Sequence, residues 1–117
     1  MRTDVKKVTV IDDLSTGKID NIYPHIESNR LCFRKGDFMN PSILEEVIKD
    51  ADVICHQGGL NFVTKSYENP LKYVNVNISG FVQIMELAVK HKVSKVICAS
   101  SSSVYGDSNE FPSNEKN

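Results

Sequence analysis

Four short apolar runs alternate along the chain with longer stretches in which apolar residues recur every three or four positions. Each run holds four or five residues, and all but Leu31–Arg34 are rich in Val and Ile, which is typical of β-strands. The runs are Val8–Ile11, Leu31–Arg34, Asp52–His56 and Val96–Ala99. Because the third run is apolar throughout its middle, we expect a strand that is buried on both faces.

Two helices are predicted between these strands, and both begin at an Asn-Pro pair. Asn suits the position that caps a helix and Pro suits its first turn, as at Asn40-Pro41 and Asn69-Pro70. The second helix should continue to about Lys92, with an apolar stripe facing the core. The stripe consists of Leu71, Val74, Ile78, Phe81, Met85 and Ala88.

The order of elements predicts an α/β fold with a parallel sheet and helices packed on its faces. Residues 18–29 add at most one weak helical turn, broken at Pro24. We expect residues 1–106 to form the domain and residues 107–117, which are polar and without periodicity, to form a flexible tail. Ligands of such sheets bind beyond the carboxyl ends of the strands, so the candidate chemistry lies in the residues that follow each strand.

The composition excludes several classes of protein. The 117 residues include 14 Lys+Arg and 15 Asp+Glu, a balance that argues against electrostatic binding of nucleic acid or of a membrane surface. No apolar run is long enough to span a bilayer, and no secretory signal is visible. No spacing of Cys and His fits a metal site. The three cysteines, Cys32, Cys55 and Cys98, are odd in number and each lies in an apolar run. We therefore expect buried free thiols of a cytoplasmic protein and no disulfide framework.

Several residues at the predicted strand ends have both a chemical and a structural interpretation. Asp12 could accept two hydrogen bonds from a ribose diol or form a turn. Gly36-Asp37 could offer a carboxylate to an adenine amino group or be an ordinary turn. Gly58-Gly59 could let the backbone approach a pyrophosphate or be a plain loop. His56 is better explained by packing than by catalysis, and Ser100–Ser103 offer hydroxyl donors without a partner base.

Six motifs occur in the order and spacing of a known family. They are V-T-V-I-D-D-L-S-T-G (8–17), G-D-F (36–38), D-V-I-C-H-Q-G-G (52–59), V-x-x-S-x-x-x-P (63–70), N-I-S-G (77–80) and A-S-S-S-S-V-Y-G (99–106). Over about residues 5–112 the chain resembles the extended short-chain dehydrogenase/reductases, in particular the NAD-dependent epimerase/dehydratase branch typified by UDP-glucose 4-epimerase. The resemblance implies NAD as cofactor, a nucleotide-sugar as substrate, and transient oxidation of a sugar hydroxyl.

The resemblance also implies a role for each matching residue. The cofactor-binding residues would be Asp12, Asp37, Phe38, Gln57, Gly58, Gly59 and Asn77. Among them, Asp12 would hold the adenosine ribose, and Asp37 with Phe38 would bracket the adenine. Ser101 would be the catalytic hydroxyl that helps to polarise the sugar carbonyl. The residues facing the nucleotide-sugar would be Ser102 and Ser103.

The sequence departs from the family pattern in what it lacks. No G-x-x-G-x-x-G phosphate loop precedes Val8, no Tyr-x-x-x-Lys pair follows Ser101, and Lys116 is the only candidate base after Gly106. In the strand order 3-2-1-4-5-6 the absent first strand is the central one, and the strands present correspond to 2, 3, 4 and 5. We therefore expect a partial Rossmann fold, an incomplete and inactive piece of such an enzyme. Members of the branch form homodimers, and helix 70–92 is a candidate dimer face by resemblance.

Two other interpretations remain open at this point. A non-catalytic remnant of the same fold, which binds a nucleotide or a protein partner, would lack the same motifs. A receiver-type signalling domain would explain the acidic pair Asp12-Asp13, but it needs an Asp at the carboxyl end of the third strand. That end holds Cys55, His56 and Gln57, whereas Asp52 lies at the opposite end.

Overall fold

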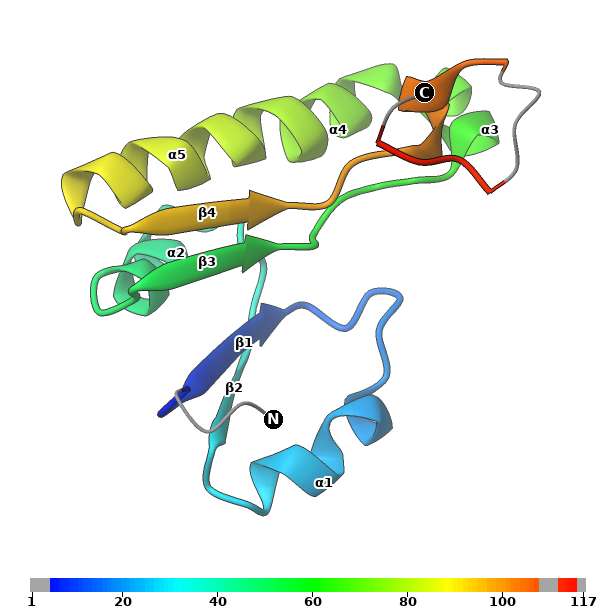
Figure 1. Ribbon diagram of the computed structural model, residues 1–117. Helices are drawn as coiled ribbons and strands as arrows, with labels where there is room; N and C mark the ends of the chain where they lie inside the picture. Colours follow the sequence, from blue (N-terminus) through cyan, green and yellow to red (C-terminus); the bar gives the residue numbers. More distant parts are fainter. Residues whose placement is uncertain (1–4, 108–111, 116–117) are drawn as a thin grey trace.

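The computed structural model describes residues 5–107 and 112–115 of the chain (Figure 1). Its strands are β1 (Val8–Asp12), β2 (Leu31–Lys35), β3 (Val53–His56) and β4 (Lys95–Cys98). They form two parallel pairs, β1 with β2 and β3 with β4. The α/β class and the four strands are thus confirmed, but within the described ranges no strand joins β1 to β3. Residues 108–111 and 116–117 of the predicted tail, Lys116 included, lie outside the described residues.

The helices follow the predicted order, with α3 and η3 as additions. The α-helices are α1 (Tyr23–Ile26), α2 (Pro41–Ile48), α3 (Val63–Glu68), α4 (Pro70–Val74) and α5 (Gly80–Lys90). Short 3₁₀ segments span Ile19–Asn21 (η1) and Ser102–Tyr105 (η3), and a π-helical segment, η2 (Asn75–Ser79), joins α4 to α5. The short segments η1 and α1 fall in residues 18–29, where a weak helical turn was expected. The additions α3 and η3 bury none of their residues, so they carry no apolar periodicity that would have predicted them.

Local chemistry explains where the helices begin. The side chain of Asn40 accepts hydrogen bonds from the backbone N–H groups of Ser42 (3.1 Å) and Ile43 (3.4 Å), which caps α2. Asn69 caps α4 in the same way, through the N–H of Lys72 at 3.3 Å. Both Asn-Pro starts are therefore confirmed. The break expected at Pro24 is wrong, because Pro24 lies in the first turn of α1, where its missing N–H costs no helical bond.

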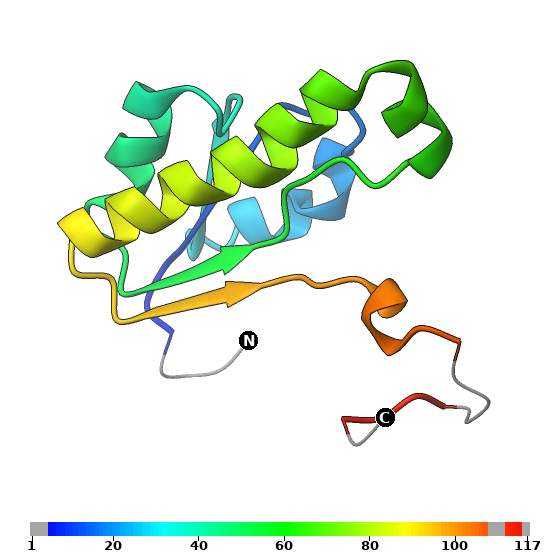
Figure 2. The same ribbon diagram turned by 90° about the horizontal axis from the view of Figure 1, so that it is seen from above.

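The core is small and lies where α2 and α5 meet. Its buried members are Leu44 and Ile48 of α2 and Ile84 and Ala88 of α5. Partly buried hydrophobic side chains pack against it, namely Phe38, Ile54, Leu87 and Val93. Figure 2 shows α1 and α2 on opposite sides of β1 and β2, with α5 on one side of β3 and β4.

The apolar stripe predicted for the long helix is wrong over most of its length. Leu71 is 77% exposed and Ile78 is 58% exposed, whereas Gly80, Ile84 and Ala88 are buried. Leu71 and Val74 lie in α4, before the π-helical segment η2, so the predicted stripe is already off the buried side where the helix begins. The buried side of this helix is formed instead by Gly80, Ile84 and Ala88 of α5, and only Ala88 belongs to the predicted stripe.

The prediction of buried cysteines is also wrong. All three are free, but Cys55 and Cys98 are exposed and Cys32 is half-buried. Only one face of the β3–β4 pair is covered, and Ile54 on that face packs against the core. Val53 and Cys55 alternate with Ile54 and point to the other face, so β3 is not buried on both faces as its sequence suggested.

Candidate functional site

The predicted site residues gather where the strands end. Figure 1 shows the arrowheads of β1, β3 and β4 pointing to the same side of the molecule. Most of the predicted residues lie at or directly after the ends of these strands and of β2. Asp12 is the last residue of β1, Ser102 and Ser103 begin η3, and Asn77 lies in η2. All of them are exposed except Phe38, which is half-buried, so they form a solvent-accessible rim at the carboxyl edge.

At the end of β1, two aspartates form consecutive turns. The Oδ1 atom of Asp12 accepts a hydrogen bond from the N–H of Leu14 at 2.7 Å, and Asp13 Oδ1 accepts one from Ser15 N–H at 2.8 Å. The bonds from Ser15 hold the pKa of Asp13 below its ordinary value. Gly17 lies so close that a Cβ there would be 3.2 Å from Asp12 Oδ1. The turn-forming role of Asp12 is therefore confirmed, and its ribose-binding role stays a prediction.

At the end of β2, Asp37 and Phe38 point to different surroundings. Asp37 Oδ1 accepts a hydrogen bond from the N–H of Met39 at 2.8 Å, and its carboxylate is exposed. The ring of Phe38 instead meets the ring of His56 edge-on, with centroids 5.6 Å apart. Its Cε2 atom would lie 2.7 Å from a Cβ on Gly80. The Phe38 side chain thus has a packing role, and only its backbone lies beside Asp37 at the rim.

His56 is a packed histidine, as the sequence favoured. Its ring stacks on Phe81 with centroids 6.0 Å apart, in addition to the edge contact with Phe38. Burial lowers the pKa of His56 below its ordinary value, because desolvation disfavours the charged imidazolium. The neutral ring therefore packs between Phe38 and Phe81, beneath the loop that follows β3.

The loop after β3 is held by Asn77. The Oδ1 atom of Asn77 accepts the N–H of Leu60 at 2.8 Å, and its Nδ2 donates to the carbonyl of Leu60 at 2.9 Å. A Cβ on Gly59 would lie 3.2 Å from Asn77 Oδ1, so the loop backbone passes directly against this amide. Asn77 thereby fixes the loop that contains Gln57, Gly58 and Gly59.

At the end of β4, Ser101 caps the short helix η3. Its Oγ accepts the N–H of Ser103 at 3.2 Å and donates to the Oγ of Ser103 at 3.1 Å. Ser102 is exposed at the first position of η3. Within the described part of the chain, no Tyr, Lys or His is recorded in a hydrogen bond with Ser101.

A pocket of about 380 Å³ lies beside these loops and includes residues that the sequence did not single out. It is lined by Ser15, Thr16, Gly59, Leu60, Asn61, Phe62, Lys65, Glu68, Asn69, Lys72 and Tyr73. Only Gly59 belongs to the predicted set. Lys65 was missed because α3 carries no periodic signal. Lys72 lies in α4, three residues after the recognised cap Asn69, but no motif distinguished it.

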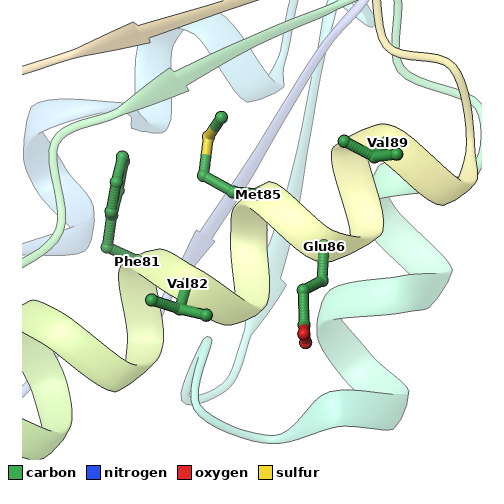
Figure 3. A pocket seen from close by; sticks show the side chains of 5 residues that line it. All are labelled: Phe81, Val82, Met85, Glu86 and Val89. Atoms are coloured by element: carbon green, nitrogen blue, oxygen red, sulfur yellow. The ribbon is translucent and has the colours of Figure 1, made fainter.

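A second and more open hollow runs along α5 (Figure 3). Its volume is about 570 Å³, and it is lined by Phe81, Val82, Met85, Glu86 and Val89. Four of these five side chains are apolar, and none belongs to the predicted site. This hollow is therefore a feature of the exposed helix surface and is separate from the rim.

The described residues contain neither a metal-binding cluster nor a membrane-spanning helix. No three or more His, Cys, Asp or Glu side chains come together in a way that could hold a metal ion. Within the same residues, no helix combines the length and the apolar character needed to cross a membrane.

The fold and the rim by themselves define a class of protein. Parallel strands joined by helices, with carboxylates and glycines at their carboxyl ends, are typical of nucleotide-binding Rossmann folds. A family profile described as GDP-mannose 4,6 dehydratase matches residues 2–117. The chain belongs to this family, which places it among the epimerases and dehydratases of the extended short-chain dehydrogenase/reductases.

Curated relatives support the same family. The UDP-glucose 4-epimerase of Dictyostelium discoideum is 34% identical over 110 residues, which cover 91% of this chain and 32% of that protein. The UDP-glucose 4-epimerase of Neisseria meningitidis serogroup C is 31% identical over 114 residues, covering 93% of this chain and 33% of the relative. The chain thus spans about a third of the length of the curated relatives it matches.

Solved structures share the fold. A UDP-N-acetylglucosamine 4-epimerase from Methanobrevibacter ruminantium M1 is 37% identical, with a TM-score of 0.78 over 93% of this chain and 34% of the other. A dTDP-glucose 4,6-dehydratase from Streptomyces venezuelae, solved with NAD bound, has a TM-score of 0.81 at 26% identity and covers 91% and 33% of the two chains. The expectation of a partial Rossmann fold is confirmed.

Proposed function

We propose that these residues form the adenosine-binding and substrate-facing part of an NAD-dependent nucleotide-sugar epimerase or dehydratase. The observation that carries the proposal is the rim itself. Asp12, Asp37 and the loop held by Asn77 follow three parallel strands and face the same solvent-accessible edge. Relatives solved with NAD share this arrangement of elements.

The residues of the rim fit the cofactor. A carboxylate at the end of β1 suits a ribose diol, and its negative charge would repel a 2′-phosphate, which favours NAD over NADP. Gly58 and Gly59 are exposed and lack a Cβ, so the backbone there can approach a phosphate or ribose closely. Asp37 and the backbone of Phe38 are available to bracket the adenine. NAD would supply the acceptor for a hydride from a sugar hydroxyl.

The serines at the end of β4 fit the substrate side. We assign to Ser101 the hydrogen bond that polarises the reacting sugar oxygen, and to Ser102 and Ser103 contacts to the nucleotide-sugar. The 3.1 Å bond between Ser101 Oγ and Ser103 Oγ would be exchanged for a bond to that oxygen. The hydroxyl of Ser101 is exposed, so the exchange requires no movement of the core.

The 117 residues alone are proposed to bind NAD weakly and to be inactive. The printed sequence holds no G-x-x-G-x-x-G loop to donate backbone hydrogen bonds to a pyrophosphate, and no Tyr-x-x-x-Lys pair to transfer the proton. Exposed apolar residues of α4 and α5, such as Leu71 and Val89, support the further proposal that the enzyme forms a homodimer through this helix. A cytoplasmic location fits the three free thiols.

The signalling alternative has little support. Asp52 precedes β3, where its carbonyl accepts the N–H of Ser94, and so lies away from the rim. A phosphoacceptor role would require it at the carboxyl end. A non-catalytic remnant is the alternative that the experiment below must separate.

A chimera tests the proposal directly. Residues 5–107 would replace the matching third of the Bifidobacterium longum UDP-glucose 4-epimerase, whose structure, solved with NAD⁺ and UDP, has a TM-score of 0.80 with this chain. We expect the chimera to epimerise UDP-glucose, and Ser101→Ala to lower kcat by about 10²- to 10³-fold. The matched control Ser100→Ala should change kcat by less than about twofold. A folded, NAD-binding chimera that is inactive, or that does not respond to Ser101→Ala, would favour the remnant.

A further inference from the structure

The loop after β1 contains an unusual backbone conformation. Leu14 has a φ of 60°, in the left-handed region that side chains other than glycine rarely adopt. Among the described residues, the other non-glycine residues with a positive φ are Asn29 and Lys92, which follow the helices α1 and α5. A left-handed residue is a usual way to end a helix. Leu14 instead follows a strand, so its conformation has to be held by local contacts.

The carboxylates of Asp12 and Asp13 supply these contacts. Asp12 Oδ1 accepts the N–H of Leu14 at 2.7 Å, and Asp13 Oδ1 accepts the N–H of Ser15 at 2.8 Å. The carbonyl of Asp12 accepts the N–H of Gly36 at 3.0 Å. The backbone of Asp12 is thus tied to the end of β2, while its side chain turns the chain back at Leu14.

The loop closes on the Asp12 carboxylate at Gly17. The atoms nearest to a Cβ at Gly17 would be Oδ1, Oδ2 and Cγ of Asp12, at 3.2, 3.4 and 3.5 Å. Among the glycines of the described ranges, Gly17 alone has a carboxylate as this neighbour. Because 3.2 Å is tighter than an ordinary van der Waals contact, a side chain here would turn the carboxylate or open the loop. The orientation of the carboxylate is therefore set by two groups of its own loop, the N–H of Leu14 and the backbone of Gly17.

This orientation matters for a ribose diol, which donates two hydrogen bonds to one carboxylate. Both bonds form only where the two oxygens face the two hydroxyls, and a displacement of less than about 1 Å weakens such an arrangement. Asp12 Oδ1 already accepts the bond from Leu14, but each carboxylate oxygen has a further lone pair. The loop thus fixes the direction of the carboxylate and leaves hydrogen-bonding capacity for a ligand.

We propose that Gly17 is a positioning residue that determines how Asp12 receives the adenosine ribose. It acts through the absence of a Cβ, which lets the loop close on the carboxylate without turning it. Leu14 contributes through its backbone, because the left-handed turn directs the chain back toward Asp12. The inference rests on the proposed function of the rim, and the variants below separate failure of the one from failure of the other.

The test measures the affinity for NAD of the chimera that carries residues 5–107, after its bound cofactor has been removed. Asp12→Ala should weaken NAD binding by about tenfold or more, because two hydrogen bonds to a charged group are lost. Gly17→Ala should weaken it by about three- to tenfold, because the carboxylate is turned. In the Asp12→Ala background, Gly17→Ala should have no further effect, since it acts through that carboxylate. The matched control Lys18→Ala, at the next exposed position, should bind NAD as the unaltered chimera does.

Two further measurements separate positioning from a general loss of structure. Gly17→Ser adds a hydroxyl that can donate a hydrogen bond to the carboxylate that its Cβ crowds, so its affinity for NAD should lie between those of Gly17→Ala and the unaltered chimera. In the 117-residue chain without cofactor, Gly17→Ala should speed hydrogen exchange at the Leu14 amide by about threefold or more, because its acceptor is displaced.

The outcomes that contradict the two proposals differ. If Asp12→Ala binds NAD as tightly as the unaltered chimera, Asp12 does not hold the ribose and the proposed function of the rim fails. If Asp12→Ala weakens binding but Gly17→Ala does not, the positioning role of Gly17 is wrong and the proposed function stands. The same conclusion follows if Gly17→Ala weakens binding equally with and without Asp12, or if it leaves exchange at Leu14 unchanged.

Discussion

At the scale of single residues, turn formation and ligand binding prove to be compatible uses of one side chain. Asp12, Asp37 and Ser101 each accept a hydrogen bond from the backbone N–H two residues further on. That bond takes only part of each side chain's hydrogen-bonding capacity, since a carboxylate or hydroxyl oxygen has further lone pairs. The local bond orients the group at the end of its strand, and the remaining capacity faces solvent. The two interpretations drawn from the sequence for Asp12 therefore do not compete.

The packed ring of His56 should make stability depend on pH. Burial lowers the pKa of His56 in the folded protein. Near and below about pH 6.5 the imidazole of the unfolded chain therefore binds a proton more readily than that of the folded chain. The free energy of unfolding should therefore fall as the pH drops through that range. His56→Phe keeps an aromatic ring between Phe38 and Phe81 and should remove this part of the pH dependence. Urea titrations of both proteins between about pH 5 and pH 8 check it, and identical pH slopes would contradict the assignment.

The two bonds of Asn77 to Leu60 predict a specific cost for losing the amide. In Asn77→Asp the Nδ2 donor becomes an oxygen that faces the Leu60 carbonyl, so one bond is replaced by repulsion. We expect a loss of about 1 kcal/mol in the free energy of unfolding and faster hydrogen exchange at Leu60. The matched control is Asn75→Asp, an exposed position on the same π-helical segment. If both variants exchange alike at Leu60, Asn77 does not hold the loop.

At the scale of elements, the close approach of α5 to the start of α2 depends on one glycine. A Cβ on Gly80 would lie 2.7 Å from both Met39 Sδ and Phe38 Cε2. The methionine can move aside, but the ring is held against His56. Gly80→Ala should therefore destabilise the protein by about 1 kcal/mol or more, because overpacking outweighs the gain in helix propensity. Thermal or urea unfolding measures this, with Ser79→Ala as the control. A stabilised Gly80→Ala variant would show that the contact relaxes freely.

The elements that sequence predicted are those with a local physical signal. The Asn-Pro caps at residues 40–41 and 69–70 act through neighbouring backbone groups, so they could be located without the tertiary structure. The buried face of the long helix could not, because the apolar residues of α4, Leu71 and Val74, are exposed although their spacing is that of a core-facing stripe. Burial of Cys55 could not either, since it depends on what covers the second face of the sheet. For the site, strand ends were predictable, whereas the hold of Asn77 on Leu60, 17 residues away, was not.

At the scale of the whole molecule, the chain is less compact than its length allows. Its radius of gyration is 16.2 Å, against about 13 Å expected for a globular domain of this size. The four buried hydrophobic residues of the described chain all lie in α2 and α5. The β1–β2 pair with α1 contributes none of them. A divided sheet and a core confined to one part imply that the two parts differ in stability.

We therefore predict that the molecule opens in two steps. Amides of β1 and β2 should exchange through openings of lower free energy than amides of α5, because few buried contacts oppose their separation. Leu44→Ala should lower the free energy of opening of α5 by about 2 to 4 kcal/mol, since Leu44 is 3% exposed and belongs to the core. The same variant should change the exchange of β1 and β2 much less, and Val10→Ala should do the reverse. Native-state hydrogen exchange resolves the two sets of amides. If instead all amides share one free energy of opening, and both variants shift it equally, the molecule opens as a single cooperative unit and the prediction is wrong.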